Sequence, residues 1–252
     1  MRQALTIIAA MTLALTLVMV GASSAETPVG SNIESRVVLA LKVNDDAVTA
    51  QLPQGWRGLT LPQGPFAGAN LLVLLSDRHL GLDPDGTPID PPASRYAALV
   101  AYGVSPEAKG PRMFVLRTYE TPPVVAVYGN AVAAEISRVS TLSGSGDGPR
   151  ERTETWEIAA ENGDRISVKL DYSQGRPGWS SGEAMPYSAE TPDFHRIYRY
   201  DQLADLAMST GLGRPLDGEI AFDASVPSLL DGTQELQALT VIPVYVRKVS
   251  LP

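Results

Sequence analysis

The segment from Trp156 to Tyr172 reads WEIAAENGDRISVKLDY, in which two runs of alternating apolar residues flank a central Asn-Gly pair. Apolar side chains at every second position lie on one face of a β-strand. Asn162 and Gly163 supply the positive φ angles that a tight hairpin turn requires. The segment therefore predicts an antiparallel hairpin with one apolar face.

Strand-like segments continue on both sides of this hairpin. Turns at many of the 20 prolines and 22 glycines separate short apolar runs, a pattern that suits sheets better than long helices. We expect strands at residues 35–43, 70–75, 96–102, 112–119, 124–128, 196–200, 219–224 and 236–249, the last interrupted by Pro243. We expect short helices at residues 45–52, with Asn44 or Asp45 as the N-cap, and at residues 201–208.

These elements predict a mainly β fold of the α+β class. A curled or closed antiparallel β-barrel, with an internal cavity and a few short helices, is the economical arrangement, because closure removes exposed strand edges. The Gly- and Ser-rich residues 143–149 indicate a flexible loop between strands and not a domain boundary. One domain is therefore expected over residues 26–252.

The first 25 residues have the order of a secretory signal peptide. Arg2 gives a basic start, an apolar run covers residues 4–20, and small residues follow, with Ser23 and Ala25 three and one positions before the expected cut. The apolar run is also long enough for a retained membrane anchor, but the small residues that follow it favour cleavage after Ala25. We expect an exported protein, periplasmic or secreted, that leaves the membrane after signal cleavage.

Charge and residue usage argue against several classes of function. The net charge of −8 offers no electrostatic footprint for nucleic acid. The chain has no cysteine, and His79 and His195 are far apart in sequence, so a metal site is not expected. Phosphate-cradling glycine motifs are absent, so no cofactor is expected either. The expected partner is a small molecule, and the oligomeric state is left open.

Residues Gly178 to Gly182 match the G-x-S-x-G pattern of serine hydrolases. That pattern marks a nucleophile only on a sharp turn between a strand and a helix. Pro177 and Pro186 flank it and predict a loop instead. The loop is the favoured interpretation.

Polar residues are set among small and apolar ones between residues 119 and 138. Such a pattern can line the floor of a cavity, or it can be a strand end with solvated charges, and both interpretations stay open. The ligand-binding candidates in this segment are Tyr119, Tyr128, Asn130, Glu135 and Arg138.

This segment resembles the acetoacetate decarboxylase superfamily. Residues 123–130 read PVVAVYGN, residues 135–138 read EISR, and the hairpin follows. Members of the family have a Gly-Arg-Glu-like turn, a Pro-Lys-Lys-like motif and a hairpin in the same order. Residues 35–56 resemble the family's opening strand, helix and Leu-Pro-x-Gly-like turn, and residues 218–249 resemble its closing strands. The resemblance spans most of the mature chain as an order of elements with few identities.

The resemblance implies a cone-like antiparallel β-barrel around an apolar cavity. In that cavity the decarboxylases use a lysine to form a Schiff base with a keto acid. Ser137 and Arg138 stand at the positions of the family's lysine pair, and neither can form an imine. The lysines of this chain are Lys42, Lys109, Lys169 and Lys248, none of which lies in the matching segment.

The favoured hypothesis is an exported, acetoacetate-decarboxylase-like protein that lacks the Schiff-base lysine. It would bind a small apolar or carboxylate-bearing molecule in a barrel cavity, with Arg138 holding the carboxylate. Two alternatives stay open. One is a lyase or hydrolase on the same scaffold that uses Glu135, Tyr128 or His195 as acid or base. The other is a structural protein of the cell envelope, with a filled barrel and an apolar surface patch.

Overall fold

The computed structural model describes residues 25–146, 148, 150–230, 232 and 234–252. The predicted signal peptide, residues 1–25, lies outside the described residues except for Ala25, so its cleavage stays a prediction. Within the described ranges no helix combines the length and hydropathy that a membrane crossing requires.

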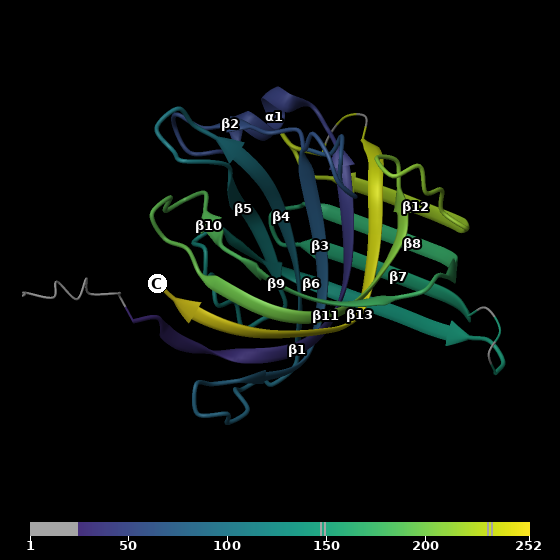
Figure 1. The fold of residues 1–252 in the computed structure, drawn as a ribbon. Helices are drawn as coiled ribbons and strands as arrows, with labels where there is room; N and C mark the ends of the chain where they lie inside the picture. The colour runs from purple at the N-terminus through teal and green to yellow at the C-terminus, as the bar shows by residue number, and fades with distance from the viewer. Residues whose placement is uncertain (1–24, 147, 149, 231, 233) are drawn as a thin grey trace, which may run out of the picture.

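One short helix and a large set of strands form the fold (Figure 1), which is mainly β as the sequence predicts. The helix α1 spans Asp45–Ala50, and the side chain of Asn44 caps it as expected. The strands are β1 (Thr27–Lys42), β2 (Arg57–Gly58), β3 (Leu71–Leu82), β4 (Ser94–Val104), β5 (Arg112–Glu120), β6 (Ala131–Ser143), β7 (Arg150–Ala160), β8 (Arg165–Gln174), β9 (Gly178–Ala184), β10 (Pro186–Ser188), β11 (Ile197–Ser209), β12 (Gly218–Ser225) and β13 (Glu235–Leu251).

The strands join in one sheet with the order β12-β8-β7-β6-β5-β4-β3-β1-β13-β11-β9, while β10 pairs with β5 and β2 with β4. Most neighbours are antiparallel, but β6 and β10 each pair with β5 in parallel. The edge strands β12 and β9 do not pair with each other in the part of the chain that the structure describes. The sheet is therefore mixed and open, whereas the sequence pattern predicts a curled or closed antiparallel one.

The parallel pair arises from the segment between β5 and β6. A strand is predicted over residues 124–128, but this stretch is a loop. Pro122 and Pro123 precede it and have no N–H groups for a ladder. Residues 121–130 therefore turn the chain, and β6 begins at Ala131 beside the end of β5.

The predicted hairpin is confirmed as β7 and β8. Trp156 lies opposite Val168 and Ile158 opposite Ile166, in the register that the alternation requires. Gly163 has a φ of +92° in the turn. Trp156 is completely buried, so the apolar face of the hairpin contributes directly to the core.

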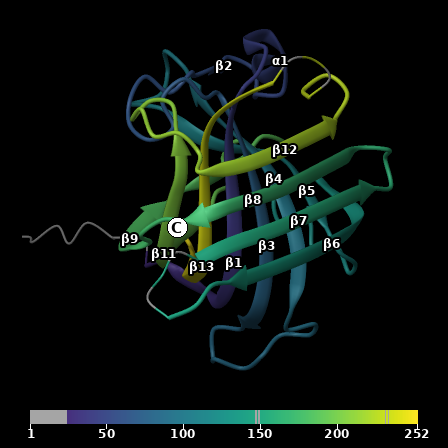
Figure 2. The same ribbon diagram turned by 90° about the vertical axis from the view of Figure 1, so that its right-hand side faces the viewer.

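The core lies between two halves of the sheet. Figure 2 shows β6, β7, β8 and β12 running across β3, β4 and β5. Inward side chains of both halves form one cluster, to which β1 contributes Val37, Leu39 and Leu41. The alternate residues of β1, Val38 and Ala40, pack into two smaller clusters on the opposite face. The central strands are thus covered on both faces.

Two predictions in the C-terminal half are wrong. Residues 201–208 are predicted as a helix but lie in β11, where pairing with β13 on one side and β9 on the other outweighs their helix propensity. The G-x-S-x-G segment is predicted as a loop but forms β9. Ser180 lies opposite Gln202 in a strand pair, so it does not occupy a turn between strand and helix.

Candidate functional site

Strand β6 directs Arg138 into the space between the two halves of the sheet. Ala134 and Ile136 are core residues of this strand, and Arg138 continues the same face at the next alternate position. Glu135 and Ser137 face outward and are exposed. Arg138 is therefore the sequence-predicted candidate that reaches the interior from β6.

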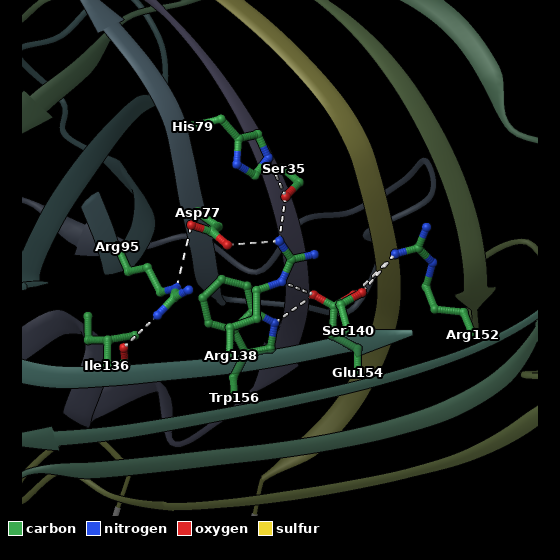
Figure 3. Close-up of polar contacts among 10 residues, drawn as sticks. All are labelled: Ser35, Asp77, His79, Arg95, Ile136, Arg138, Ser140, Arg152, Glu154 and Trp156. Atoms are coloured by element: carbon green, nitrogen blue, oxygen red, sulfur yellow. Dashed lines mark hydrogen bonds and ion pairs between the residues drawn. The ribbon is translucent and has the colours of Figure 1, made fainter. Parts of the chain in front are cut away.

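The guanidinium of Arg138 connects both halves of the sheet. Its Nε donates to Glu154 Oε1 at 2.9 Å, and its Nη1 donates to Ser35 Oγ at 2.6 Å and to Asp77 Oδ2 at 3.1 Å (Figure 3). The group also lies 5.1 Å from the centre of the Trp156 ring. Nη2 makes none of these contacts, and in Figure 3 it points toward the side on which Arg152 lies.

Glu154 is the most buried acid of this group, with 1% of its side chain exposed. It accepts hydrogen bonds from Arg138, from Trp156 Nε1 at 2.8 Å and from Arg152 Nη1 at 3.4 Å. Arg138 and Arg152 thus compensate one buried carboxylate between them. Such pairing is what allows a carboxylate to remain ionised in the interior.

The opposite wall comes from β1, β3 and β4. Asp77 of β3 forms an ion pair with Arg95 Nε at 3.4 Å as well as with Arg138. His79 Nε2 lies 3.1 Å from Ser35 Oγ, which itself accepts from Arg138. Five strands, β1, β3, β4, β6 and β7, therefore meet at one polar site.

We refer to Arg95, Arg138, Arg152, Asp77 and Glu154 as the arginine cluster. Three guanidinium groups face two carboxylates, which leaves one positive charge without a counterpart. Arg152 Nε is buried and has no hydrogen-bond partner among the described residues. Guanidinium donors that are not used internally suit a carboxylate or another planar anion.

Metal binding and Schiff-base formation have less support at this cluster than anion binding has. The described residues contain no group of three or more His, Cys, Asp or Glu side chains that could hold a metal ion. All four lysines lie in the described part of the chain. Lys42 is half-buried and pairs with Asp45 at the start of α1, whereas Lys109, Lys169 and Lys248 are exposed. None of them is available as an inward-facing amine.

Tyr119 has a structural partner at the hairpin turn. Its hydroxyl donates to Asp164 Oδ2 at 2.7 Å, and Arg117 Nη1 donates to the same oxygen at 2.7 Å. Burial and the contact with Asp164 raise the pKa of Tyr119. Burial alone would raise the pKa of Asp164, but the hydrogen bonds from Tyr119, Asn162 and Arg117 outweigh it and lower that pKa.

The remaining candidates lie elsewhere. Tyr128 packs on the face of the sheet opposite the main core and shares a short hydrogen bond with the Tyr198 hydroxyl. Asn130 Nδ2 donates to the backbone oxygen of Val115 at 2.7 Å. Glu135 lines a surface groove of about 330 Å³ on the outer side of β6. The five candidates therefore do not form one site, and a ligand role for each stays a prediction.

The acid–base residues of the alternative hypothesis, Glu135, Tyr128 and His195, do not come together either. His195 stacks on Tyr187 with ring centres 4.4 Å apart. No hydrogen bond links any two of His195, Tyr128 and Glu135 within the residues that the structure covers.

Sequence reasoning missed the partners of Arg138, although β7 carries a local signal. Arg152 and Glu154 occupy the same face of the strand as Trp156, four and two residues before it. Charged residues that interrupt an apolar face need partners there. Asp77 and Arg95 belong to strands that approach Arg138 only in the folded chain, so no local pattern indicates them.

Known proteins match this chain in structure and not in sequence. No family model and no curated protein match it. The enduracididine biosynthesis enzyme MppR complexed with pyruvate superposes with a TM-score of 0.53 at 12% identity, over 97% of this chain and 96% of that one. An acetoacetate decarboxylase-like enzyme from Sphingomonas wittichii RW1 gives a TM-score of 0.54 at 12% identity, over 90% and 92%. The chain therefore has the fold of the acetoacetate decarboxylase-like enzymes, as the order of its sequence elements predicted.

Proposed function

We propose that this protein is exported and that it binds a small carboxylate reversibly in the arginine cluster, without forming a Schiff base. One observation carries the proposal. The arginine cluster, between the two halves of the sheet, contains three guanidinium groups but only two carboxylates. A protein of the same fold has been solved in complex with pyruvate, a small carboxylate. The signal-like order of residues 1–25 supports export.

The bound carboxylate would take two of the guanidinium donors that the cluster leaves unused. Arg138 Nη2 makes none of the cluster's hydrogen bonds, and Arg152 Nε is buried without a partner among the described residues. A carboxylate there would neutralise the surplus charge through charge-assisted hydrogen bonds. The apolar part of the ligand would face Trp156 and the neighbouring core.

The absence of an inward lysine separates this function from decarboxylation through an imine. A guanidinium does not form a Schiff base with a keto acid under physiological conditions, because it stays protonated. The cluster can hold and orient a carboxylate but offers no amine nucleophile. We therefore place binding, and not carbon–carbon bond cleavage, at this site.

Calorimetric titration of the mature protein with pyruvate tests the site. We expect Arg152→Gln to weaken pyruvate binding by about tenfold or more, because one charge-assisted contact is lost. Glu154 keeps Arg138 and Trp156 as partners in this variant, so the fold should survive. Arg165→Gln, an exposed arginine of the neighbouring strand, is the matched control and should bind as the unmodified protein does.

The uncharged methyl ester of pyruvate completes the experiment, since it retains the shape and lacks the anion. The proposal requires it to bind at least tenfold more weakly than pyruvate. Equal affinity for acid and ester, or an equal loss in Arg152→Gln and Arg165→Gln, would show that the arginine cluster does not recognise the carboxylate.

A further inference from the structure

A second pocket opens where β7 begins and β8 ends. Its volume is about 870 Å³, within the range of small-molecule sites. Gln174, Gly175 and Arg176 form one side of it, and Ala207 of β11 and Arg214 lie on its other walls. None of these residues belongs to the arginine cluster.

Two acceptors at the wall of this pocket have unfilled hydrogen-bonding capacity. Gln174 lines the pocket, and Asp205 lies directly behind two lining residues, Gly175 and Arg214. Asp205 is 1% exposed, and its Oδ2 accepts from Gly175 N at 2.9 Å and from Tyr172 Oη at 3.3 Å. Its Oδ1 is buried and accepts no hydrogen bond among the described residues, and the same holds for Oε1 of Gln174. A buried acceptor without a donor is costly, so the pair indicates a missing donor group.

Arginine side chains supply the opposite charge. Arg214 Nη2 lies 3.7 Å from Asp205 Oδ1, an ion pair too long for a hydrogen bond. The side chain of Arg214 is 45% exposed, and its displacement toward the solvent would uncover Asp205 Oδ1. Arg176 lines the same pocket and forms no ion pair with a carboxylate in the described ranges. A negative group at the pocket mouth would therefore find two guanidinium partners.

Gly175 packs closely against this loose ion pair. A Cβ atom at this position would lie 2.6 Å from Arg214 Nη2 and 2.9 Å from Asp205 Oδ1. Any larger residue would therefore have to displace both charged groups. The glycine is thus required for the present arrangement of Arg214 and Asp205 at the pocket wall.

We propose that this pocket binds an α-amino acid as a zwitterion. The ammonium donates to Asp205 Oδ1 and Gln174 Oε1, and the adjacent carboxylate accepts from Arg214 and Arg176. Insertion of the ligand exchanges one loose ion pair for two closer ones, so the charge of the pocket stays balanced. The residues proposed to hold the amino acid are not members of the arginine cluster, although Tyr172, which donates to Asp205, pairs with Arg152 of the cluster across the β7–β8 hairpin.

A thermal-shift screen of the mature protein with the twenty standard L-amino acids, followed by calorimetry on those that stabilise it, tests the proposal. We expect at least one amino acid to bind, and acetate and ethylamine, which each carry half of the zwitterion, to bind at least about tenfold more weakly. Gly175→Ala should lose binding by about tenfold or more. Gly178→Ala is the matched control, because a Cβ there meets no atom within 4 Å.

Two results would overturn the proposal: no stabilisation by any of the twenty amino acids, or equal amino-acid affinity in Gly175→Ala and Gly178→Ala. Pyruvate titration of Gly175→Ala separates the two sites, since its affinity should equal that of the unmodified protein. Amino-acid binding without pyruvate binding would reject the proposed function and leave this inference standing. Asp205→Asn should also reduce amino-acid affinity while retaining the shape of the side chain.

Discussion

Glu154→Gln is expected to lower the free energy of unfolding by about 3–5 kcal/mol, the range found when one partner of a buried ion pair is removed. Glu154 is 1% exposed and is the carboxylate that Arg138 and Arg152 share. Its replacement by a neutral amide leaves two guanidinium groups at the interior with Asp77 as the remaining acid of the cluster. Urea unfolding at neutral pH, followed by tryptophan fluorescence, measures the change.

Glu157→Gln is the matched control for this variant. Glu157 lies on the same strand but faces outward, where it is exposed and accepts from Ser167 Oγ at 2.9 Å. We expect its free energy of unfolding to stay within about 0.5 kcal/mol of that of the unmodified protein, as is usual for surface substitutions. A similar loss in both variants would contradict a special role for the buried carboxylate.

Glu34→Gln is expected to have a comparable effect on the opposite face of β1. Glu34 is completely buried, pairs with Arg36, accepts from Tyr96 Oη at 2.7 Å and lies 4.0 Å from Arg247 Nη2. Loss of its charge leaves Arg36 and Arg247 without their shared counterion, at a cost of about 3–5 kcal/mol. Glu26→Gln, which removes an exposed partner of Arg199, should leave the unfolding midpoint unchanged.

The pH dependence of Glu34→Gln distinguishes the lost charge from a packing defect. Burial alone would raise the pKa of Glu34, but Arg36 and Arg247 outweigh it and hold that pKa below its usual value. The stabilisation is therefore complete above the unfolded pKa of about 4.3 and is lost as the pH falls through the folded value. Below pH 4.3 the unmodified protein should lose stability more steeply than the variant. Parallel curves for the two proteins would assign the loss at neutral pH to packing.

Local sequence patterns predicted several of the strands. The β7–β8 hairpin appears where period-two alternation around Asn-Gly predicts it, and β4, β5 and β12 appear where short apolar runs between turn residues predict strands. Strand β6 was missed because it begins with small residues and pairs in parallel with β5, for which the sequence carries no turn signal. Residues 201–208 have a helix-favouring composition, and only their pairing with β9 and β13 makes them a strand.

Pro243 shows how a local rule depends on its context. The residue was expected to interrupt the last strand, but β13 continues through it to Leu251. Arg36 pairs with Ile242 and Glu34 with Tyr245, so Pro243 falls within a bulge. A bulge tolerates the missing N–H group of proline.

The candidate site was only partly predictable, because contacts between distant segments decide which polar residues come together. The family resemblance identified Arg138, but its partners come from β1, β3 and β7 and are assembled only by folding. Tyr119 was chosen because polar residues set among apolar ones can line a cavity floor, whereas the structure shows it bonded to Asp164. Buried polar groups need partners, and spatial proximity decides whether the partner is the protein or a ligand.

Mass spectrometry of the mature protein mixed with pyruvate tests the central claim most directly, with native and denaturing spectra recorded before and after borohydride treatment. A reversible carboxylate site without a Schiff base predicts one pyruvate of added mass in the native spectrum. The denaturing spectrum should show the bare protein mass with or without borohydride, because no imine is present to be reduced. A covalent adduct that survives denaturation after borohydride would contradict the account, and so would a native spectrum that shows no bound pyruvate at saturating concentration.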